Sequence, residues 1–336
     1  MDQTKNKIPP AQVLWLLAVL LVVSIFVSLL AGRFPISLAD VMKVLSGYSD
    51  NEQISHIIYQ VRLPRIFAAI QVGGALAVSG AAYQGMFKNP LVSPDLLGAS
   101  SGASFGAVLG IVLSVGIAGT KMMAFAFGLL AVMMAWFIAA RIGKGNNMVF
   151  LLVLGGILVS GLFQSLITLM KYTADTENKL PEITFWLMGS LNKATYQDAL
   201  GMMAPFSICI AVLVFCSNKI NILALGEEEA KSLGVNTRLL QVIITVSATV
   251  LTAYSISVTG TIGWIGLIVP HLARMMMGPN FKYVIPGSLL LGAVYLLLMD
   301  DLCRSLMTIE IPLGITTSLV GIPFLIFLMS RRESGW

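Results

Sequence analysis

Few residues in this sequence have a type and spacing that could do chemistry. Its only histidines, His56 and His271, lie far apart in the chain. No G-x-x-x-x-G-K-[ST] phosphate loop is present, so the chain cannot hydrolyse ATP by the P-loop route. The cysteines lie in or beside apolar runs without metal-ligand spacing, and we expect small buried residues there (Cys209, Cys216 and Cys303). With no nucleophile beside a base, we predict no enzyme, no metal site and no cofactor.

Asp300 and Asp301 are the only carboxylates that we place near an apolar run long enough to cross a membrane. Arg304 follows within about one helical turn of both, which favours local charge pairing over ion coupling. Carriers driven by protons or sodium usually keep ionisable groups at the middle of the membrane. An ion-coupled secondary transporter is therefore an alternative that the residues disfavour.

The most polar segment inside this apolar chain is Leu223–Asn236, which reads LALGEEEAKSLGVN. Its glutamates come first and its lysine comes late, which suits a helix macrodipole, and Gly234 suits a C-terminal cap. We predict a helix of about two turns after Gly226, too short to be stable alone and in need of a supporting surface. Ala230 and Leu233 are expected to form its small apolar face. A solvated loop between two spans is the alternative.

The composition predicts an all-α polytopic membrane protein. Of 336 residues, 57% are hydrophobic and 11% are charged, and the mean hydropathy is +0.87. Soluble domains carry roughly 25% charged residues. Lysine and arginine flanking the spans account for the net charge of +5, so we predict no nucleic-acid partner. We interpret the first apolar run, Val13–Ala31, as an uncleaved span embedded in membrane lipid.

About ten transmembrane helices are expected, since each needs about 20 apolar residues. The candidate spans are 13–31, 65–86, 98–117, 121–141, 148–171, 198–217, 241–261, 262–277, 284–302 and 313–330. With the N-terminus inside, 12 basic residues fall on the cytoplasmic side and 9 outside, which favours cytoplasmic termini. This topology puts residues 32–61 and 172–197 in long outer loops, and 218–240 in a cytoplasmic loop.

A faint internal match suggests an inverted five-helix repeat in one transmembrane domain, 1–336. Repeat one would cover about 1–172, and repeat two about 198–336. Identical or similar residues recur at the same spacing (Val78, Ser79, Gly80, Pro90 and Gly98 against Val258, Thr259, Gly260, Pro270 and Gly278). Repeats with an odd number of spans are inverted in many transporters. Chance is the alternative, because glycine is common here.

Four stretches together resemble one family. They are Arg62–Arg65 running into VGGALAVSGAAYQGMFKNPLVSPDLLGASSGA, then LALGEEEAKSLGV, then GTIGWIGLIVPHLAR, and finally EIPLGITTSLVGIPFLIFLM. In this order they resemble the permease subunit of type II ABC importers for iron-siderophore, haem or cobalamin. The resemblance runs from Arg62 to the C-terminus, and residues 172–197 contribute nothing to it.

The resemblance implies a protein of the bacterial cytoplasmic membrane with both termini in the cytoplasm. Such permeases have ten transmembrane helices and work as homo- or heterodimers with a second permease subunit. Two ABC ATPase subunits bind the cytoplasmic face, and a substrate-binding lipoprotein or periplasmic protein delivers the cargo from outside. ATP hydrolysis then belongs to the ATPase subunits, and this chain is the path.

The resemblance also implies roles for particular residues. The ATPase coupling surface would be formed by the polar cytoplasmic segment (Leu225, Gly226, Glu227, Ala230, Leu233 and Gly234). Basic residues at the outer rim would dock the binding protein (Arg62, Arg65 and Arg304), since a guanidinium holds a carboxylate with two hydrogen bonds. Ordinary interfacial arginines are the alternative. The cytoplasmic gate would fall at Asn146 and Asn147, where the family often has Thr or Ser, and an ordinary turn fits these residues equally.

These features predict an ABC importer permease for a metal chelate, with iron-siderophore as the first expectation. Permeases for haem or cobalamin are the nearest alternatives, and the ion-coupled carrier is a more distant one. The sequence does not fix the cargo, because in such importers selectivity lies largely with the binding protein.

Overall fold

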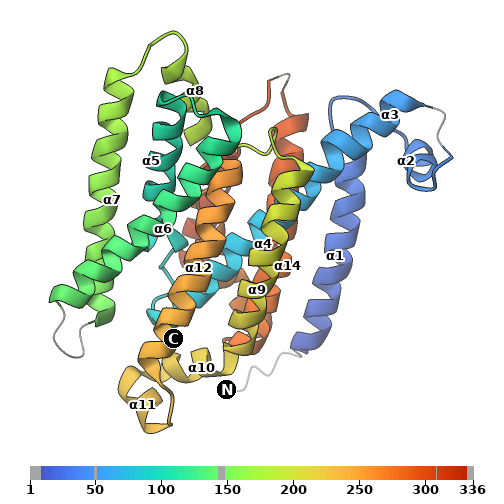
Figure 1. The fold of residues 1–336 in the computed structure, drawn as a ribbon. Coiled ribbons are helices and arrows are strands. Elements are labelled where there is room, and N and C mark those ends of the chain that lie inside the picture. The colour runs from blue at the N-terminus through green and yellow to red at the C-terminus, as the bar shows by residue number, and fades with distance from the viewer. Residues whose placement is uncertain (1–8, 49–50, 143–147, 308, 331–336) are drawn as a thin grey trace.

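The structure is a computed structural model that describes residues 9–48, 51–142, 148–307 and 309–330. Within these ranges the regular elements are all helices, and no strand occurs. Figure 1 shows long helices running in roughly one direction, with short helices at both ends of the bundle. The all-α prediction is confirmed.

Each of the ten predicted spans is a helix. Seven helices are long and apolar enough to cross a membrane, and three apolar helices are shorter. The spans are α1 Pro10–Leu30, α4 Leu63–Met86, α5 Ala99–Val112, α6 Gly116–Ile142, α7 Met148–Thr173, α9 Tyr196–Phe215, α12 Thr237–Thr259, α13 Ile265–Met277, α14 Phe281–Ser305 and α15 Leu313–Ser330. The short ones are α5, α13 and α15.

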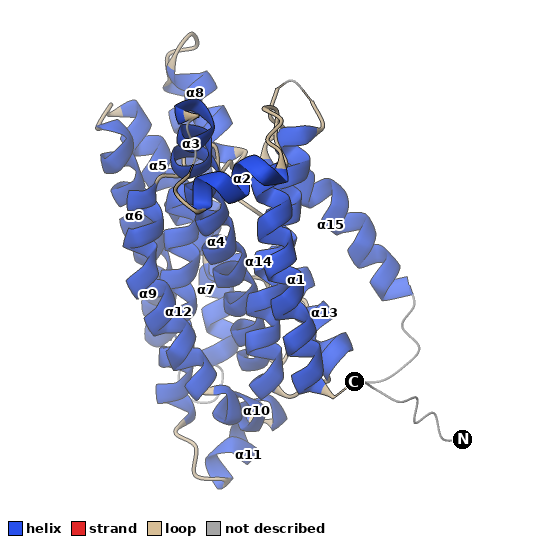
Figure 2. Cartoon of the chain, turned by 90° about the vertical axis from the view of Figure 1, so that its right-hand side faces the viewer, coloured by secondary structure: helices blue, strands red, loops and turns tan. Residues whose placement is uncertain are grey.

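The remaining elements define two ends of the bundle (Figures 1 and 2). The α8 end holds the predicted outer loops, which are partly helical rather than irregular: α2 Leu38–Leu45, α3 Glu52–His56, the π-helix η1 Ile57–Arg62 and α8 Lys179–Leu187. The α11 end holds α10 Ser217–Leu225 and α11 Glu227–Ser232. The first residues of α1 and the last of α15 also lie at the α11 end. A 3-10 helix, η2 Pro94–Leu97, lies between α4 and α5.

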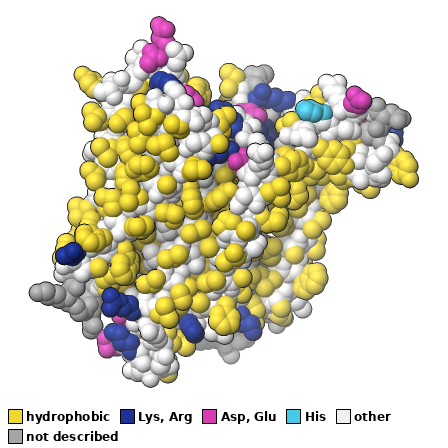
Figure 3. Space-filling model, in the orientation of Figure 1, with side chains coloured by type: hydrophobic (Ala, Val, Ile, Leu, Met, Phe, Trp, Pro, Cys, Tyr) yellow, Lys and Arg dark blue, Asp and Glu magenta, His cyan; other side chains and the backbone are white. Residues whose placement is uncertain are grey.

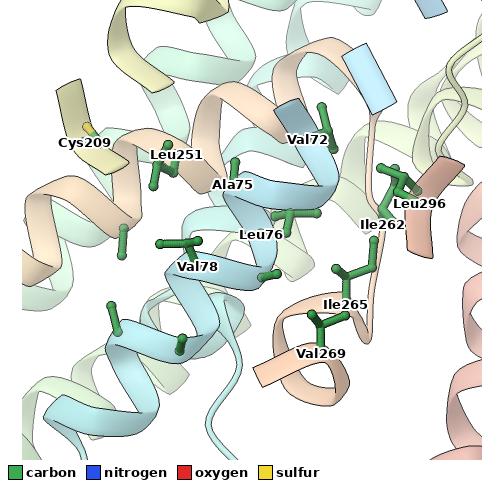
Figure 4. Close-up of a cluster of buried hydrophobic side chains, with 14 of the residues drawn as sticks. Val72, Ala75, Leu76, Val78, Cys209, Leu251, Ile262, Ile265, Val269 and Leu296 are labelled. Atoms are coloured by element: carbon green, nitrogen blue, oxygen red, sulfur yellow. The ribbon is translucent and has the colours of Figure 1, made fainter. Parts of the chain in front are cut away.

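Helix α4 is the centre of the bundle, because small residues let its neighbours approach closely. A Cβ on Gly80 would lie 1.8 Å from the Gly266 carbonyl oxygen of α13, and one on Gly73 would lie 2.2 Å from that of Gly292 in α14. Figure 4 shows buried side chains of α4 facing those of α12 and α13. All of α4 from Ala68 to Met86 except Ile70 is buried.

The residue match that suggested the repeat does not mark equivalent positions. Gly80 lies inside α4, whereas Gly260 follows the end of α12. Pro90 precedes α5 outside any helix, whereas Pro270 lies within α13. Each half nevertheless has a short helix as its third span, α5 and α13. The division into two repeats stays a prediction.

Candidate functional site

Helix α11 has the form that the sequence predicted for the polar segment. Glu227–Ser232 form a helix, and Gly234 takes the left-handed conformation with a φ of +79°. The Val235 amide donates to the Ala230 carbonyl at 2.9 Å, and the Gly234 amide donates to the Lys231 carbonyl at 2.9 Å. These two bonds form a Schellman motif, which satisfies the last carbonyls of a very short helix.

A stiff connection joins α11 to α12. Only a few residues after the Schellman motif, the Asn236 side chain accepts a hydrogen bond from the Leu239 amide at 3.0 Å and caps α12. Thr237 is buried, and its hydroxyl donates to a Glu227 carboxylate oxygen at 3.4 Å. A displacement of α11 would therefore be transmitted directly to the long helix α12.

The two residues predicted to form the apolar face of α11 lie in different environments. Ala230 is fully buried and faces the bundle, whereas Leu233 is 62% exposed. The two residues therefore do not share one face, because Leu233 is the C-cap and lies outside the helix proper. Leu225, just before α11, is also exposed. Ala230 holds the helix to the bundle, and the two leucines are available to a partner.

The charges of α11 are arranged along its own axis. Lys231 lies 3.3 Å from Glu227 and 3.4 Å from Glu228. Desolvation lowers the pKa of Lys231, but these carboxylates outweigh it and raise the pKa overall. The pairs are exposed and stabilise the helix only weakly.

At the α8 end, Arg65 is buried and fully engaged inside the chain. Its Nε lies 2.8 Å from an Asp300 oxygen, and its Nη2 donates to Asp300 at 2.8 Å. Its Nη1 donates to both oxygens of Glu310, at 3.1 and 3.2 Å. Arg65 thus joins α4 to α14 and to the segment that precedes α15.

Arg304 and Arg62 join the first helix to the same cluster. Arg304 pairs with Asp301 and donates to the Ser28 hydroxyl of α1 at 2.7 Å. Ser28 in turn donates to Asp301 at 2.9 Å. Arg62 donates to the carbonyls of Leu29 and of Phe34, the latter at 2.6 Å. The predicted local pairing of Asp300 and Asp301 with Arg304 is confirmed, and it extends further than expected.

The placement of these arginines bears on their predicted docking role. Arg62, Arg65 and Arg304 are between 3% and 6% exposed, so their guanidinium groups do not project from the rim. We call them, with Asp300, Asp301 and Glu310, the ionic cluster. Its geometry gives these arginines a structural task, and direct contact with a partner stays a prediction. The proposed gate residues, Asn146 and Asn147, lie outside the described residues.

A cavity of about 510 Å³ opens between the two halves of the chain. Its walls include Met188 after α8, Thr261 after α12 and Ser318 of α15. Asp95 of η2 and Ser100 of α5 also line it. Most of the wall is apolar or small, and hydroxyl groups and the Asp95 carboxylate supply its polar side chains.

Asp95 is the functional candidate that sequence reasoning missed. The predicted spans 65–86 and 98–117 left residues 87–97 between spans, and so only Asp300 and Asp301 were placed near one. The segment instead folds back into the bundle: a Cβ on Gly156 would lie 2.3 Å from the Leu96 carbonyl oxygen. Gly156 lies about 12 Å along α7 from its first residue.

Polar contacts inside the bundle hold this returning segment. The Gln84 side-chain amide donates to the carbonyl of Val92 at 3.1 Å and to those of Gly266 and Leu267 at 3.3 Å. Arg274 donates to the Gln84 side-chain oxygen. Non-helical backbone at membrane depth needs such internal partners, because lipid offers none.

The outer surface fits a membrane environment. Figure 3 shows a broad hydrophobic band across the bundle, with lysine, arginine and carboxylate side chains at its two ends. Large apolar side chains of α1 are exposed on the surface of the chain, among them Trp15, Val19 and Phe26. The chain is therefore a multi-pass membrane protein.

Comparisons with known proteins agree with this architecture. A sequence profile of the FecCD transport family matches residues 20–331. The chain is 38% identical to the molybdate import system permease protein MolB of Haemophilus influenzae, over 96% of this chain and 97% of that protein. It is 36% identical to the hemin transport system permease protein HmuU of Yersinia pestis, over 98% of each.

A solved structure has the same fold. It is described as an inward-facing conformation of a metal-chelate type ABC transporter, and it is 37% identical to this chain. The TM-score is 0.87, and the match covers 96% of this chain and 100% of the other.

Proposed function

This chain belongs to the FecCD transport family, and from that premise we propose that it is the permease of an ABC importer for a metal chelate. Two separate ATPase subunits would hydrolyse ATP, and a second permease subunit would complete the path. The observation that carries the proposal is α11, a capped helix flanked by the exposed Leu225 and Leu233 at one end of the bundle.

The geometry of α11 supports a mechanical role. A helix that transmits a force from a partner protein must be rigid and must be firmly connected to the helix that it moves. The Schellman motif and the Asn236 cap supply the stiffness and the joint. Helix α12 then runs the length of the bundle to Thr259, and the residues directly after it, including Thr261, line the cavity. Movement of α11 would thus reach the wall of the path.

We place the α11 end in the cytoplasm, together with both termini, in the bacterial cytoplasmic membrane. The excess of basic residues predicted for that side supports this orientation. The α8 end would then receive a lipoprotein or periplasmic binding protein. The ionic cluster would serve that contact by fixing the ends of α1, α4 and α14 in one rigid platform.

An iron chelate such as a siderophore complex is the first expectation for the cargo, and haem is supported by the similarity to HmuU. Molybdate is a second candidate, because the match to MolB also covers nearly the whole chain, at 38% identity. The resemblance of the folds does not separate these cargoes.

The experiment is uptake by the complete complex in liposomes, with ATP inside and ionophores that collapse the ion gradients. Continued uptake that needs ATP is expected, whereas arrest on collapse of the gradients would favour an ion-coupled carrier. A pair of variants localises the coupling: Leu233→Asp should abolish co-purification of the ATPase. Leu306→Asp, at an equally exposed (62%) leucine of the α8 end, should not. Equal effects of both variants would contradict the assignment of α11.

A further inference from the structure

The cavity carries a charge that the family assignment does not explain. Among the residues that line it, Asp95 is the single ionisable side chain, and the other polar side chains are the hydroxyls of Ser100, Thr261 and Ser318. No lysine, arginine or histidine lies in the lining. A lone carboxylate in a mostly apolar wall gives such a space a negative potential.

The carboxylate of Asp95 is exposed to this space rather than neutralised within the chain. It accepts a hydrogen bond from the Ser100 hydroxyl. No ion pair of the described residues includes it, in contrast to Asp198 and to the carboxylates of the ionic cluster. A hydroxyl donor orients a carboxylate but leaves its charge in place.

The position of Asp95 explains how a charge can be kept at this depth. It lies a few residues before Ala99, where α5 begins, and the amide end of a helix favours a negative group. Ser100 lies in the first turn of the same helix. The start of α5 favours the ionised form, and Asp95 is an exposed residue among those that line the cavity.

We propose that Asp95 makes this cavity selective for cargo that presents positive charge or hydrogen-bond donors, and unfavourable for oxyanions. The inference rests on the proposed function and narrows its substrate class. It favours a cationic or neutral, donor-bearing iron chelate, such as a ferric hydroxamate, over the molybdate dianion. In a homodimer a second Asp95 would strengthen the effect.

The potential of the cavity can be measured without knowing the cargo. In the complete permease–ATPase complex, Ser318→Cys places a thiol in the cavity wall, and the native cysteines are buried. Its reaction rates with a trimethylammonioethyl and a sulfonatoethyl methanethiosulfonate are compared. The protein without Ser318→Cys gives the background. We expect the cationic reagent to be favoured.

Three further variants isolate the charge of Asp95. Asp95→Asn keeps the acceptor for Ser100 and should lower the ratio of cationic to anionic rate about tenfold. Asp95→Glu should preserve the ratio. The matched control Asp175→Asn, which neutralises an exposed carboxylate outside the cavity, should also preserve it. A ratio unchanged in Asp95→Asn, or one that favours the anion in the parent protein, would overturn the inference.

A second measurement guards against misfolding of the Asp95→Asn variant. In the parent with Asp95 intact, the ratio should fall as salt rises from low to physiological concentration, because mobile ions screen the charge. A ratio independent of salt would also count against the proposal.

Uptake by the full complex separates this inference from the proposed function. With a cationic ferric hydroxamate and with molybdate as probes, the wild type should prefer the chelate, and Asp95→Asn should reduce that preference. ATP-driven uptake that prefers molybdate would contradict the inference about Asp95 but leave the proposed function intact. Uptake that stops when the ion gradients collapse although ATP is present, while the reagent ratio still depends on Asp95, removes the proposed function and leaves the charge of the cavity established.

Discussion

The two ends of the bundle are stabilised in opposite ways. At the α8 end, the ionic cluster joins α1, α4 and α14 through buried charges, each within reach of an opposite charge or a carbonyl. At the α11 end, a helix of six residues is held by one buried alanine, a Schellman motif and exposed ion pairs. Breaking a buried ion pair is costly because it leaves one charge buried without a partner, whereas exposed ion pairs contribute little to stability.

This difference in stabilisation indicates which end of the bundle can move. An end fixed by buried charges suits a platform on which a partner docks, and an end with little buried area suits an element that a partner displaces. The following predictions test this contrast, beginning with the largest effect.

Arg65→Ala should be the most damaging single change, because it leaves Asp300 buried without its main partner. We expect a loss of about 3–5 kcal/mol in the free energy of unfolding. The measurement is equilibrium unfolding of the purified protein in mixed micelles. A loss below about 1 kcal/mol would show that the cluster is not structural.

Ala230→Leu should be the strongest change at the α11 end. The site is fully buried, and an added isobutyl group would cost about 1–3 kcal/mol of overpacking. Because α11 has only six residues and buries only Ala230, we expect it to detach without unfolding the bundle, with loss of ATPase association and nearly unchanged global unfolding. Co-purification and unfolding measured on the same preparation check this. A large drop in global stability with retained association would reverse the roles of the two ends.

Gly234→Ala tests the cap of α11. Alanine at a φ of +79° costs about 1–2 kcal/mol of backbone strain. We expect weaker coupling, seen as less transport for each ATP hydrolysed. Gly47→Ala is the matched control, since Gly47 has a φ of +77° and, as at Gly234, no atom lies within 4 Å of where an added Cβ would be. If both variants lowered coupling equally, the cap would have no special role.

Lys231→Ala should have the smallest effect. Its pairs with Glu227 and Glu228 are exposed, so unfolding and ATPase association should both stay within error of the wild type at physiological salt. A marked loss of association would instead identify Lys231 as a contact of the partner.

Much of the fold could be predicted from sequence because apolar runs of membrane length are strong signals. All ten spans are helices, and the capped helix after Gly226 follows from glycine, glutamate and lysine order. What could not be predicted depends on contacts between distant residues. Nothing in the sequence around Arg65 indicates that its side chain would pair with Asp300, which is 235 residues away.

The same limit explains the miss at Asp95. A stretch such as residues 87–98, with two prolines, an asparagine and a glycine, predicts a turn, and a turn is normally placed in water. Its return into the bundle depends on Gln84, which supplies hydrogen bonds to its backbone, and on Gly156, which makes room for it. These are tertiary effects that the stretch itself does not contain.

The contact between Gly80 and Gly266 has a mechanical consequence. No side chain separates the backbones of α4 and α13 there, so neither helix can slide along the other without a collision of main-chain atoms. We expect the pair to behave as a single strut during each cycle of transport. Any rearrangement that admits cargo must then move other helices, at positions that leave the contact between α4 and α13 intact.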